Sequence, residues 1–340
     1  MAKETLTRDR MSLVDDNPPG PPGAPGDSQD RGREVSESPS AKAISPLAGD
    51  PISYVAIHPE AAHPAPCNLP EDLRITWSWP HLLLFCVYAV VSQLAIGVAV
   101  LAYYSTNGHL SQRQIRRLFE SDPRLIVGTN VLWFALIILF LYVTLSALPN
   151  LPFWRSLGWK RLDANPLAGK GRPWMYFLSG SGLSLFVILA SSQVKNAEHV
   201  PIQEMFKSRT GMMLLMSMAV LVAPLVEETV FRGYLYPVFA RMASGLAQSF
   251  GMDSPSAIRA GVVTSILMTG ALFGLMHAPQ LGWTWGLVSL LILVGIIFTF
   301  ARAWTGTVFA SFLLHLGYNS MLAILTIFGT KGFTYMPPHP

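Results

Sequence analysis

The chain has 340 residues, of which 51% are hydrophobic and only 13% are charged, with a net charge of +4. The apolar residues gather in long uncharged runs, which exclude an ordinary water-soluble domain and predict an all-α polytopic membrane protein. The basic residues flank these runs, next to the membrane. They favour membrane lipids as partners, through anionic headgroups, and argue against nucleic acid.

Residues 1–75 differ in kind from the rest, because the stretch DDNPPGPPGAPGDSQDRGREVSESPSAK is rich in Pro, Gly, Ser and acidic residues. This region lacks apolar periodicity, so we predict a disordered acidic tail. Cys67 in the tail and Cys86 in the first apolar run are the only cysteines. They support neither a disulfide framework nor a cysteine-based metal site.

Seven apolar runs follow, each near the roughly 20 residues that cross a hydrocarbon core. The predicted spans are Pro80–Tyr104, Leu125–Leu148, Trp174–Ser192, Met212–Tyr236, Gly261–His277, Thr284–Phe300 and Thr307–Phe328. The segment Pro237–Gly251 is compatible with two structures, a short interfacial helix or part of an eighth buried element. Residues 76–173 thus hold the first spans and basic loops, residues 174–328 the later spans, and residues 329–340 a short tail.

Basic residues cluster in the loops after the first and the second span. They are Arg113, Arg116, Arg117 and Arg124 in the first loop, and Arg155, Lys160, Arg161, Lys170 and Arg172 in the second. Because these two loops lie on opposite faces of the membrane, the positive-inside rule gives only a slight preference for a cytoplasmic N-terminus.

The fourth run ends in LVEETVFRGYL, which places three ionisable side chains directly after the uncharged stretch Met212–Val226. A charged residue at mid-span costs about 2.5–3.5 kcal/mol, so Glu227, Glu228 and Arg232 cannot face lipid. They either anchor a helix end at the membrane surface or face other helices and a polar cavity, where such groups are usually functional. Glu228 and Arg232 can pair along one helical face, whereas Glu227 points about 100° away.

Two other runs carry polar residues at helical spacing. FGLMH places Phe273 and His277 four residues apart, and HLGYN places His315 and Asn319 four residues apart. Each pair therefore shares one helical face. Either histidine alone is compatible with a packing role, but neither has an acidic partner among its sequence neighbours. The glutamates of the fourth span are the natural partners.

Two glutamates, two histidines and an asparagine are sufficient for amide hydrolysis if they meet. A partly buried glutamate can act as a general base on water, while histidine and asparagine can donate hydrogen bonds to a tetrahedral oxyanion. The sequence contains no Gly-x-Ser-x-Gly elbow, no candidate cysteine nucleophile and no His-Glu-x-x-His zinc motif. Hydrolysis would therefore use activated water.

The three motifs resemble, in order, the Glu-Glu-x-x-x-Arg, Phe-x-x-x-His and His-x-x-x-Asn motifs of the CPBP (Abi) intramembrane proteases, also called type II CAAX prenyl endopeptidase-like proteins. The resemblance covers about Met175 to Phe328. It implies Glu227 as the water-activating base, His277 as its partner, and His315 with Asn319 as the oxyanion-stabilising pair.

The same resemblance implies Glu228 and Arg232 as supporting residues and Phe273 as a residue packed near the site. It further implies a bundle of about seven to eight transmembrane helices, with residues 174–328 as the catalytic core. Gly270 and Gly274 form a small-xxx-small pair before the histidine of the fifth span, which predicts close approach of a neighbouring helix.

The sequence does not decide whether the reaction uses a metal ion. Glu228, His277 and His315 are the candidate ligands if a divalent metal such as zinc is required. The pairing of Glu228 with Arg232 and the absence of a zinc signature favour chemistry without a cofactor.

The expected substrate is a membrane-associated or lipidated protein or peptide, and the expected location is the bacterial inner membrane. Two alternatives stay open. One is a non-enzymatic scaffold or immunity-type partner protein that retains the fold. The other is a proton-coupled transporter, although the first half contains no second copy of the glutamate-bearing run.

Overall fold

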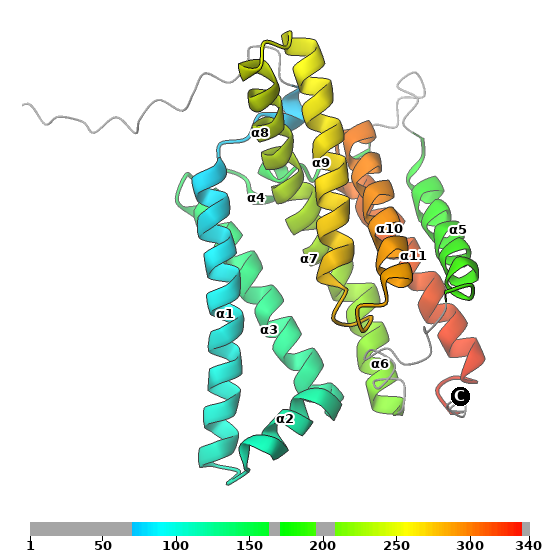
Figure 1. The fold of residues 1–340 in the computed structure, drawn as a ribbon. Coiled ribbons are helices and arrows are strands. Elements are labelled where there is room, and N and C mark those ends of the chain that lie inside the picture. The colour runs from blue at the N-terminus through cyan, green and yellow to red at the C-terminus, as the bar shows by residue number, and fades with distance from the viewer. Residues whose placement is uncertain (1–69, 163–170, 195–207, 335–340) are drawn as a thin grey trace, which may run out of the picture. The chain divides into compact units, whose positions relative to one another are not determined.

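The computed structural model describes residues 70–162, 171–194 and 208–334. The chain divides into two units, Met1–His58 and Pro59–Pro340, and only the second contains described residues. Almost the whole predicted tail, and Lys170 of the second basic loop, therefore lie outside the described residues. The described segments form helices and no strand (Figure 1), and seven of these helices are long and apolar enough to cross a membrane. The prediction of an all-α polytopic membrane protein is confirmed.

The predicted spans coincide with helices whose ends differ by a few residues. They are α1 (Trp79–Thr106), α3 (Pro123–Tyr142) with its π-helical extension η2 (Val143–Ala147), α5 (Pro173–Ser191), α9 (Ser254–Met276), α10 (Trp285–Thr305) and α11 (Val308–Gly329). A proline in the first turn starts α1, α3, α5 and α9, where its missing N–H costs no hydrogen bond. Gly306, in the left-handed conformation, ends α10.

The fourth span is much longer than its prediction. It comprises α6 (Arg209–Ser217), η5 (Met218–Val222), α7 (Ala223–Glu228), η6 (Thr229–Leu235) and α8 (Tyr236–Ser249), 41 residues without a break. At 1.5 Å per residue this is roughly 60 Å, about twice the hydrocarbon core. The undecided segment Pro237–Gly251 is thus mostly α8, a continuation of the fourth span and not a separate eighth span.

Two prolines explain why π-helix interrupts this long helix. Pro224 follows η5 and Pro237 follows η6. A proline inside an α-helix lacks a donor, and its ring clashes with the carbonyl four residues earlier. A widened π turn before each proline relieves that clash and keeps the chain helical. The Glu227–Glu228 pair therefore lies between two π segments.

Glycines allow the later helices to approach closely. A Cβ on Gly270 or Gly274 would come within 2.7 Å and 2.6 Å of the backbone nitrogens of Ile296 and Ile292 on α10. The expected close approach is confirmed, and the partner is α10. On α5, a Cβ on Gly180 would overlap the backbone carbonyl of Leu314 on α11.

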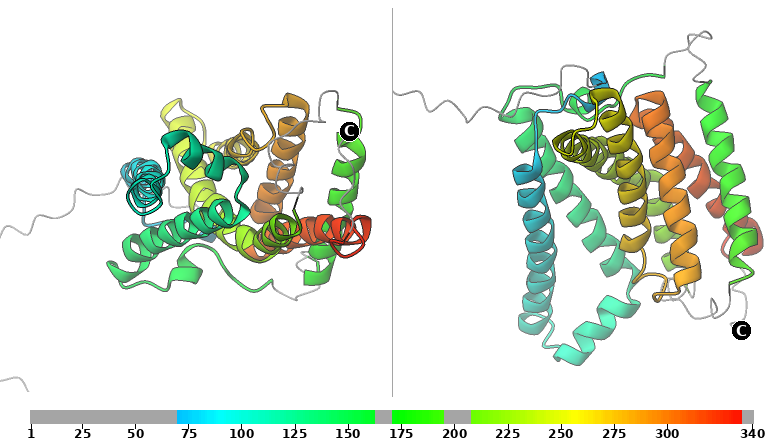
Figure 2. Two further views of the ribbon diagram at one scale, coloured as in Figure 1. Left: turned by 90° about the horizontal axis from the view of Figure 1, so that it is seen from below. Right: turned by 45° about the horizontal axis from the view of Figure 1, so that its top comes forward.

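The hairpin of α1 and α3, joined by the short helix α2 (Gln112–Ser121), contributes less to the core (Figure 2). Only 17% of the most apolar stretch of α1 and 11% of that of α3 is buried, against 33–44% for the fourth span and α9 to α11. The exposed apolar side chains of α1 and α3 suit contact with lipid tails.

Residues 70–75 correct the predicted end of the tail. They include the short helix η1 (Glu71–Leu73), and Leu73 is buried against Tyr236 and Ala240 of α8. Arg241 donates a hydrogen bond to the carbonyl of Ile75. Composition alone missed this anchor because a few apolar residues among polar neighbours produce no periodic signal over so short a segment.

The contact of Gly180 with α11 predicts that alanine substitutions at Gly180 and at nearby Gly182 have different effects on the free energy of unfolding. Gly180→Ala should lower the free energy of unfolding by about 1–3 kcal/mol or more, because the backbone of α11 cannot move aside locally. Gly182→Ala, whose Cβ would meet no atom within 4 Å, should be neutral or stabilising by about 0.5–1 kcal/mol. Thermal unfolding in detergent measures both, and equal melting temperatures would contradict the packing.

Candidate active site

Glu228 lies at the centre of the polar cluster and is fully buried. Its Oε1 accepts a hydrogen bond from Arg232 Nη1 at 3.0 Å and another from His315 Nδ1 at 2.9 Å. The pair expected between Glu228 and Arg232 from their spacing is present, although the intervening turn is π-helical. The carboxylate is thereby held by its own helix and by α11.

Arg232 is also fully buried, and each arm of its guanidinium has a partner. Besides Glu228, Nη2 donates to the carbonyl of Gly295 at 2.9 Å, and Nε donates to Thr299 Oγ1 at 3.2 Å. The guanidinium carbon lies 4.6 Å from the ring centroid of Phe273, which adds a cation–π contact. The buried charge is therefore compensated by three helices, the fourth span, α9 and α10.

His315 lies between the two glutamates. A carboxylate paired with arginine only accepts hydrogen bonds, so Nδ1 of His315 carries the proton that it shares with Glu228. Its other ring nitrogen, Nε2, lies 3.8 Å from Glu227 Oε2. The ring packs 4.9 Å from that of Phe298 and edge-on to Phe273, which fixes its orientation.

Glu227 occupies a different environment from Glu228. Its side chain is 14% exposed, whereas that of Glu228 is 0% exposed. The 3.8 Å separation from His315 Nε2 is too long for a hydrogen bond, and no other residue within the described part of the chain donates one to Glu227. The two adjacent carboxylates thus differ in hydrogen bonding and exposure, because Glu228 is fixed by two donors and Glu227 is accessible.

His277 caps the C-terminal end of α9. Its Nδ1 lies 2.7 Å from the carbonyl oxygen of Phe273, and because a carbonyl only accepts, Nδ1 is the donor. In the neutral form of the ring, Nε2 is therefore the proton acceptor. The ring packs against Phe273 at 4.8 Å between centroids. Among the described residues, Phe273 connects His277 to the cluster, and no hydrogen bond or ion pair joins His277 to Glu227.

Asn319 lies one helical turn beyond His315 and contacts the fourth span. Its Nδ2 donates a 2.7 Å hydrogen bond to the carbonyl of Ala219 in η5. The N–H of Ala223 bonds to Met218 instead, and Pro224 has no N–H. The carbonyl of Ala219 is therefore left without a backbone donor, and the asparagine supplies one.

Several residues of the site carry no sequence signal. Gly295 and Thr299 bind Arg232, and Phe298 packs on His315. No polar motif in α10 predicts that this helix contributes to the site. Trp159, in the loop before α5, donates a hydrogen bond to Thr229 Oγ1 beside Glu228. Only the three-dimensional contacts identify these four as neighbours of the motif residues.

The candidate metal ligands are Glu228, His277 and His315. Glu228 Oε1 accepts two hydrogen bonds, and Nδ1 of both histidines is engaged in a hydrogen bond, which leaves Nε2 of each ring as the nitrogen that could bind a metal ion. Within residues 70–162, 171–194 and 208–334, no three His, Cys, Asp or Glu side chains come close enough together to hold a metal ion.

The buried pair predicts a large effect of Arg232→Ala on folding. Leaving Glu228 buried without its guanidinium should cost about 3–5 kcal/mol and strongly reduce the yield of monodisperse protein in detergent. Arg259→Ala, an exposed arginine on α9, is the control and should keep normal yield. The double variant Glu228→Gln, Arg232→Met removes both charges and should recover part of the loss. Normal yield and activity of Arg232→Ala would refute this structural role.

Comparison with known proteins identifies the part of the chain that holds this cluster. Residues 209–321 match the model of the type II CAAX prenyl endopeptidase Rce1-like family. No curated protein and no solved structure gives a match to the chain. The matched segment runs from α6 into α11 and contains all three motifs. The match of residues 209–321 supports the family that the three motifs resemble, the CAAX-type intramembrane proteases of the CPBP family.

Proposed function

We propose that the protein is an intramembrane endopeptidase that hydrolyses a peptide bond with water activated by glutamate and histidine. The observation that carries this proposal is the division between the two adjacent glutamates. Glu228 is neutralised by Arg232 and His315, while Glu227 remains accessible beside Nε2 of His315. An accessible carboxylate in a poorly solvated site is suited to act as a general base.

In the proposed reaction, Glu227 removes a proton from a water molecule whose oxygen attacks the scissile carbonyl carbon. His277, with Nε2 as acceptor, holds the same water. The electron pair of the carbonyl π bond moves to the oxygen, which gives a tetrahedral intermediate with an oxyanion. The carbonyl then re-forms as the carbon–nitrogen bond breaks. Glu227 returns the proton to the leaving nitrogen, so the products are a carboxyl group and an amine.

His315 and Asn319 are proposed to stabilise the oxyanion. Because Nδ1 of His315 donates to Glu228, the ring can donate through Nε2 only as an imidazolium. Two carboxylates and one guanidinium already surround it, so a charged His315 would make the cluster electrically neutral. One N–H of the Asn319 amide is used by Ala219, and the second is left for the oxyanion.

The proposed substrate is a membrane-associated or lipidated protein or peptide. A hollow of about 680 Å³ lies between α3 and the fourth span, lined mostly by apolar side chains. Val222 and Val226 of the fourth span line it, and Val226 directly precedes Glu227. An apolar hollow lined in part by the residue that precedes the proposed base suits a substrate held in or at the bilayer.

We further propose that the reaction needs no metal ion, because no three His, Cys, Asp or Glu side chains of the described residues come close enough together to hold one. We also propose that the protein resides in the bacterial inner membrane. Cleavage should persist in excess chelator, and loss of cleavage that zinc restores would overturn the first statement.

The test of the proposed function compares protein N-termini and C-termini in host membranes that carry either wild type or Glu227→Gln at matched expression. New termini that vanish with the variant would establish the protease and reveal its substrate. The matched control is Gln248→Ala, which changes a polar residue of α8 outside the cluster and should leave the termini unchanged. Identical termini with wild type and Glu227→Gln would contradict the proposal and favour a non-enzymatic scaffold.

Asn319→Ala should lower turnover by roughly 10²–10³ if the amide donates to the oxyanion, and it should also lower stability by about 1–3 kcal/mol by orphaning the Ala219 carbonyl. Adding Pro224→Ala returns a backbone N–H that can reach this carbonyl. The double variant should therefore recover melting temperature but not turnover, with Pro224→Ala alone as the control. If the double variant recovered both melting temperature and turnover, Asn319 would act only by stabilising the fourth span through the carbonyl of Ala219.

A further inference from the structure

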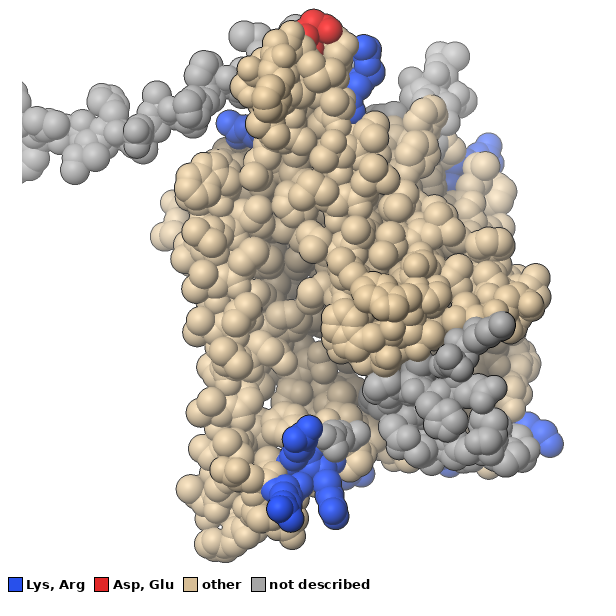
Figure 3. All heavy atoms as spheres, viewed as in Figure 1, with Lys and Arg blue, Asp and Glu red and all other residues tan. Residues whose placement is uncertain are grey.

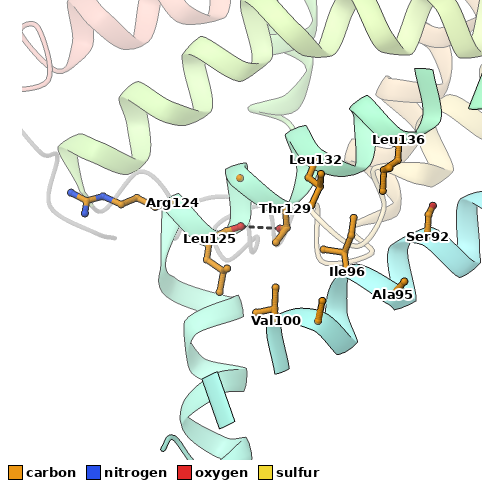
Figure 4. A pocket seen from close by; sticks show the side chains of 11 residues that line it. Ser92, Ala95, Ile96, Val100, Arg124, Leu125, Thr129, Leu132 and Leu136 are labelled. Atoms are coloured by element: carbon orange, nitrogen blue, oxygen red, sulfur yellow. Dashed lines mark hydrogen bonds between the residues drawn. The ribbon is translucent and has the colours of Figure 1, made fainter. Parts of the chain in front are cut away.

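An apolar groove lies between α1 and α3, outside the proposed site. It encloses about 500 Å³, and its lining includes Ala95, Ile96 and Val100 of α1 and Gly128, Leu132 and Leu136 of α3. We refer to it as the α1–α3 groove. Figure 4 shows side chains of the two helices lying around the space, while the guanidinium of Arg124 extends away from it.

The polar side chains of the groove offer nothing to a polar ligand. Ser92 donates to the carbonyl of Ala89, and Thr129 donates to the carbonyls of Leu125 and Ile126. Both hydroxyls are therefore satisfied within their own helices. Apart from Arg124, the groove presents only apolar surface, which suits a hydrocarbon chain.

The helix α2 holds a positive cluster at the end of the hairpin. Its N-terminus is capped by Ser111 and Gln114, and Ile115 is buried, at 2% exposure. The exposed residues Arg113, Arg116 and Arg117 recur at helical spacing on the opposite face. Figure 3 shows basic side chains gathered at this end of the molecule.

Acidic neighbours do not cancel this charge. Between Arg113 and Arg124 the sequence contains four arginines and two acids, Glu120 and Asp122, which leaves 4 − 2 = +2. Asp122 is engaged as the N-cap of α3, where it accepts a hydrogen bond from the backbone N–H of Arg124. The side chains of Arg113, Arg117 and Arg124 can thus attract a further anion.

We propose that the α1–α3 groove and the arginines Arg113, Arg117 and Arg124 bind one anionic phospholipid. One acyl chain lies in the groove, and the phosphate contacts the arginines, whose planar guanidinium groups match phosphate oxygens. Charge complementarity selects the headgroup, and the apolar lining selects the chain. This site is independent of the proposed peptide hydrolysis.

The test uses purified full-length protein in nanodiscs of equal parts phosphatidylglycerol and phosphatidylcholine, followed by detergent release and native mass spectrometry of retained lipid. Wild type should retain one phosphatidylglycerol per protein and prefer it over phosphatidylcholine by roughly tenfold or more, since each arginine near a headgroup contributes about a fivefold factor. Arg113→Gln with Arg117→Gln should weaken retention roughly thirtyfold, and Arg259→Gln should not.

A second pair of variants tests the groove. A side chain at Gly128 would extend into open space within the groove, and one at Gly97, which is outside its lining, also meets no atom within 4 Å. Gly128→Leu should displace the lipid, whereas Gly97→Leu should retain it, with equal melting temperatures in phosphatidylcholine alone. Glu227→Gln should retain it as well.

Two results would overturn the proposal. Equal retention of both phospholipids by wild type would show that the arginines select no headgroup. If the arginine variants lost the preference while Gly128→Leu kept the lipid, the helix α2 would attract anionic headgroups without a defined site.

Discussion

A buried carboxylate and a buried guanidinium inside a membrane bundle must find all their hydrogen-bond partners within the protein, because the hydrocarbon offers none. Arg232 meets this requirement with all three guanidinium nitrogens and Glu228 through Oε1, while Oε2 of Glu228 is buried without a hydrogen-bond partner among the described residues. Three other helices contribute to this environment. Arg232 reaches Gly295 and Thr299 on α10 and lies against Phe273 of α9, while His315 of α11 donates to Glu228. The helices of the matched domain are therefore positioned around one ion pair.

The accessibility of Glu227 follows from the same constraint. Once Glu228 has taken the arginine and the histidine, its neighbour has no strong donor among the described residues and remains accessible. The two prolines of the fourth span add a second constraint, because each requires a π turn that shifts the helical register beside the glutamates. Asn319 stabilises the first of these turns through Ala219. The arrangement of the site thus depends on where the backbone lacks donors.

Much of the fold could be predicted from the sequence, because uncharged runs of about 20 residues have few alternatives to spanning a membrane. The Glu228–Arg232 pair and the close approach at Gly270 and Gly274 were also predictable, since both depend on spacing within one helix. The continuity of the fourth span with α8 was not predicted, because hydropathy does not show where a helix leaves the membrane.

The parts of the site that escaped prediction arise from contacts between helices. The sequence indicated the glutamates of the fourth span as partners of the histidines, but not that His315 lies between both glutamates, or that α10 supplies the partners of Arg232. Pro224 was visible in the sequence, but its consequence for Ala219 and Asn319 requires the two helices to be placed side by side. Spacing within a helix is encoded locally, whereas these contacts depend on the assembled bundle.

The most direct test of this account compares Glu227→Gln with Glu228→Gln, measuring both melting temperature and cleavage of a substrate found in the membrane comparison. The account predicts that Glu227→Gln keeps the wild-type melting temperature and loses cleavage, whereas Glu228→Gln lowers the melting temperature because Arg232 loses its counter-charge. If the two variants behaved alike, or if Glu227→Gln still cleaved the substrate, the separate roles assigned to the adjacent glutamates would be wrong.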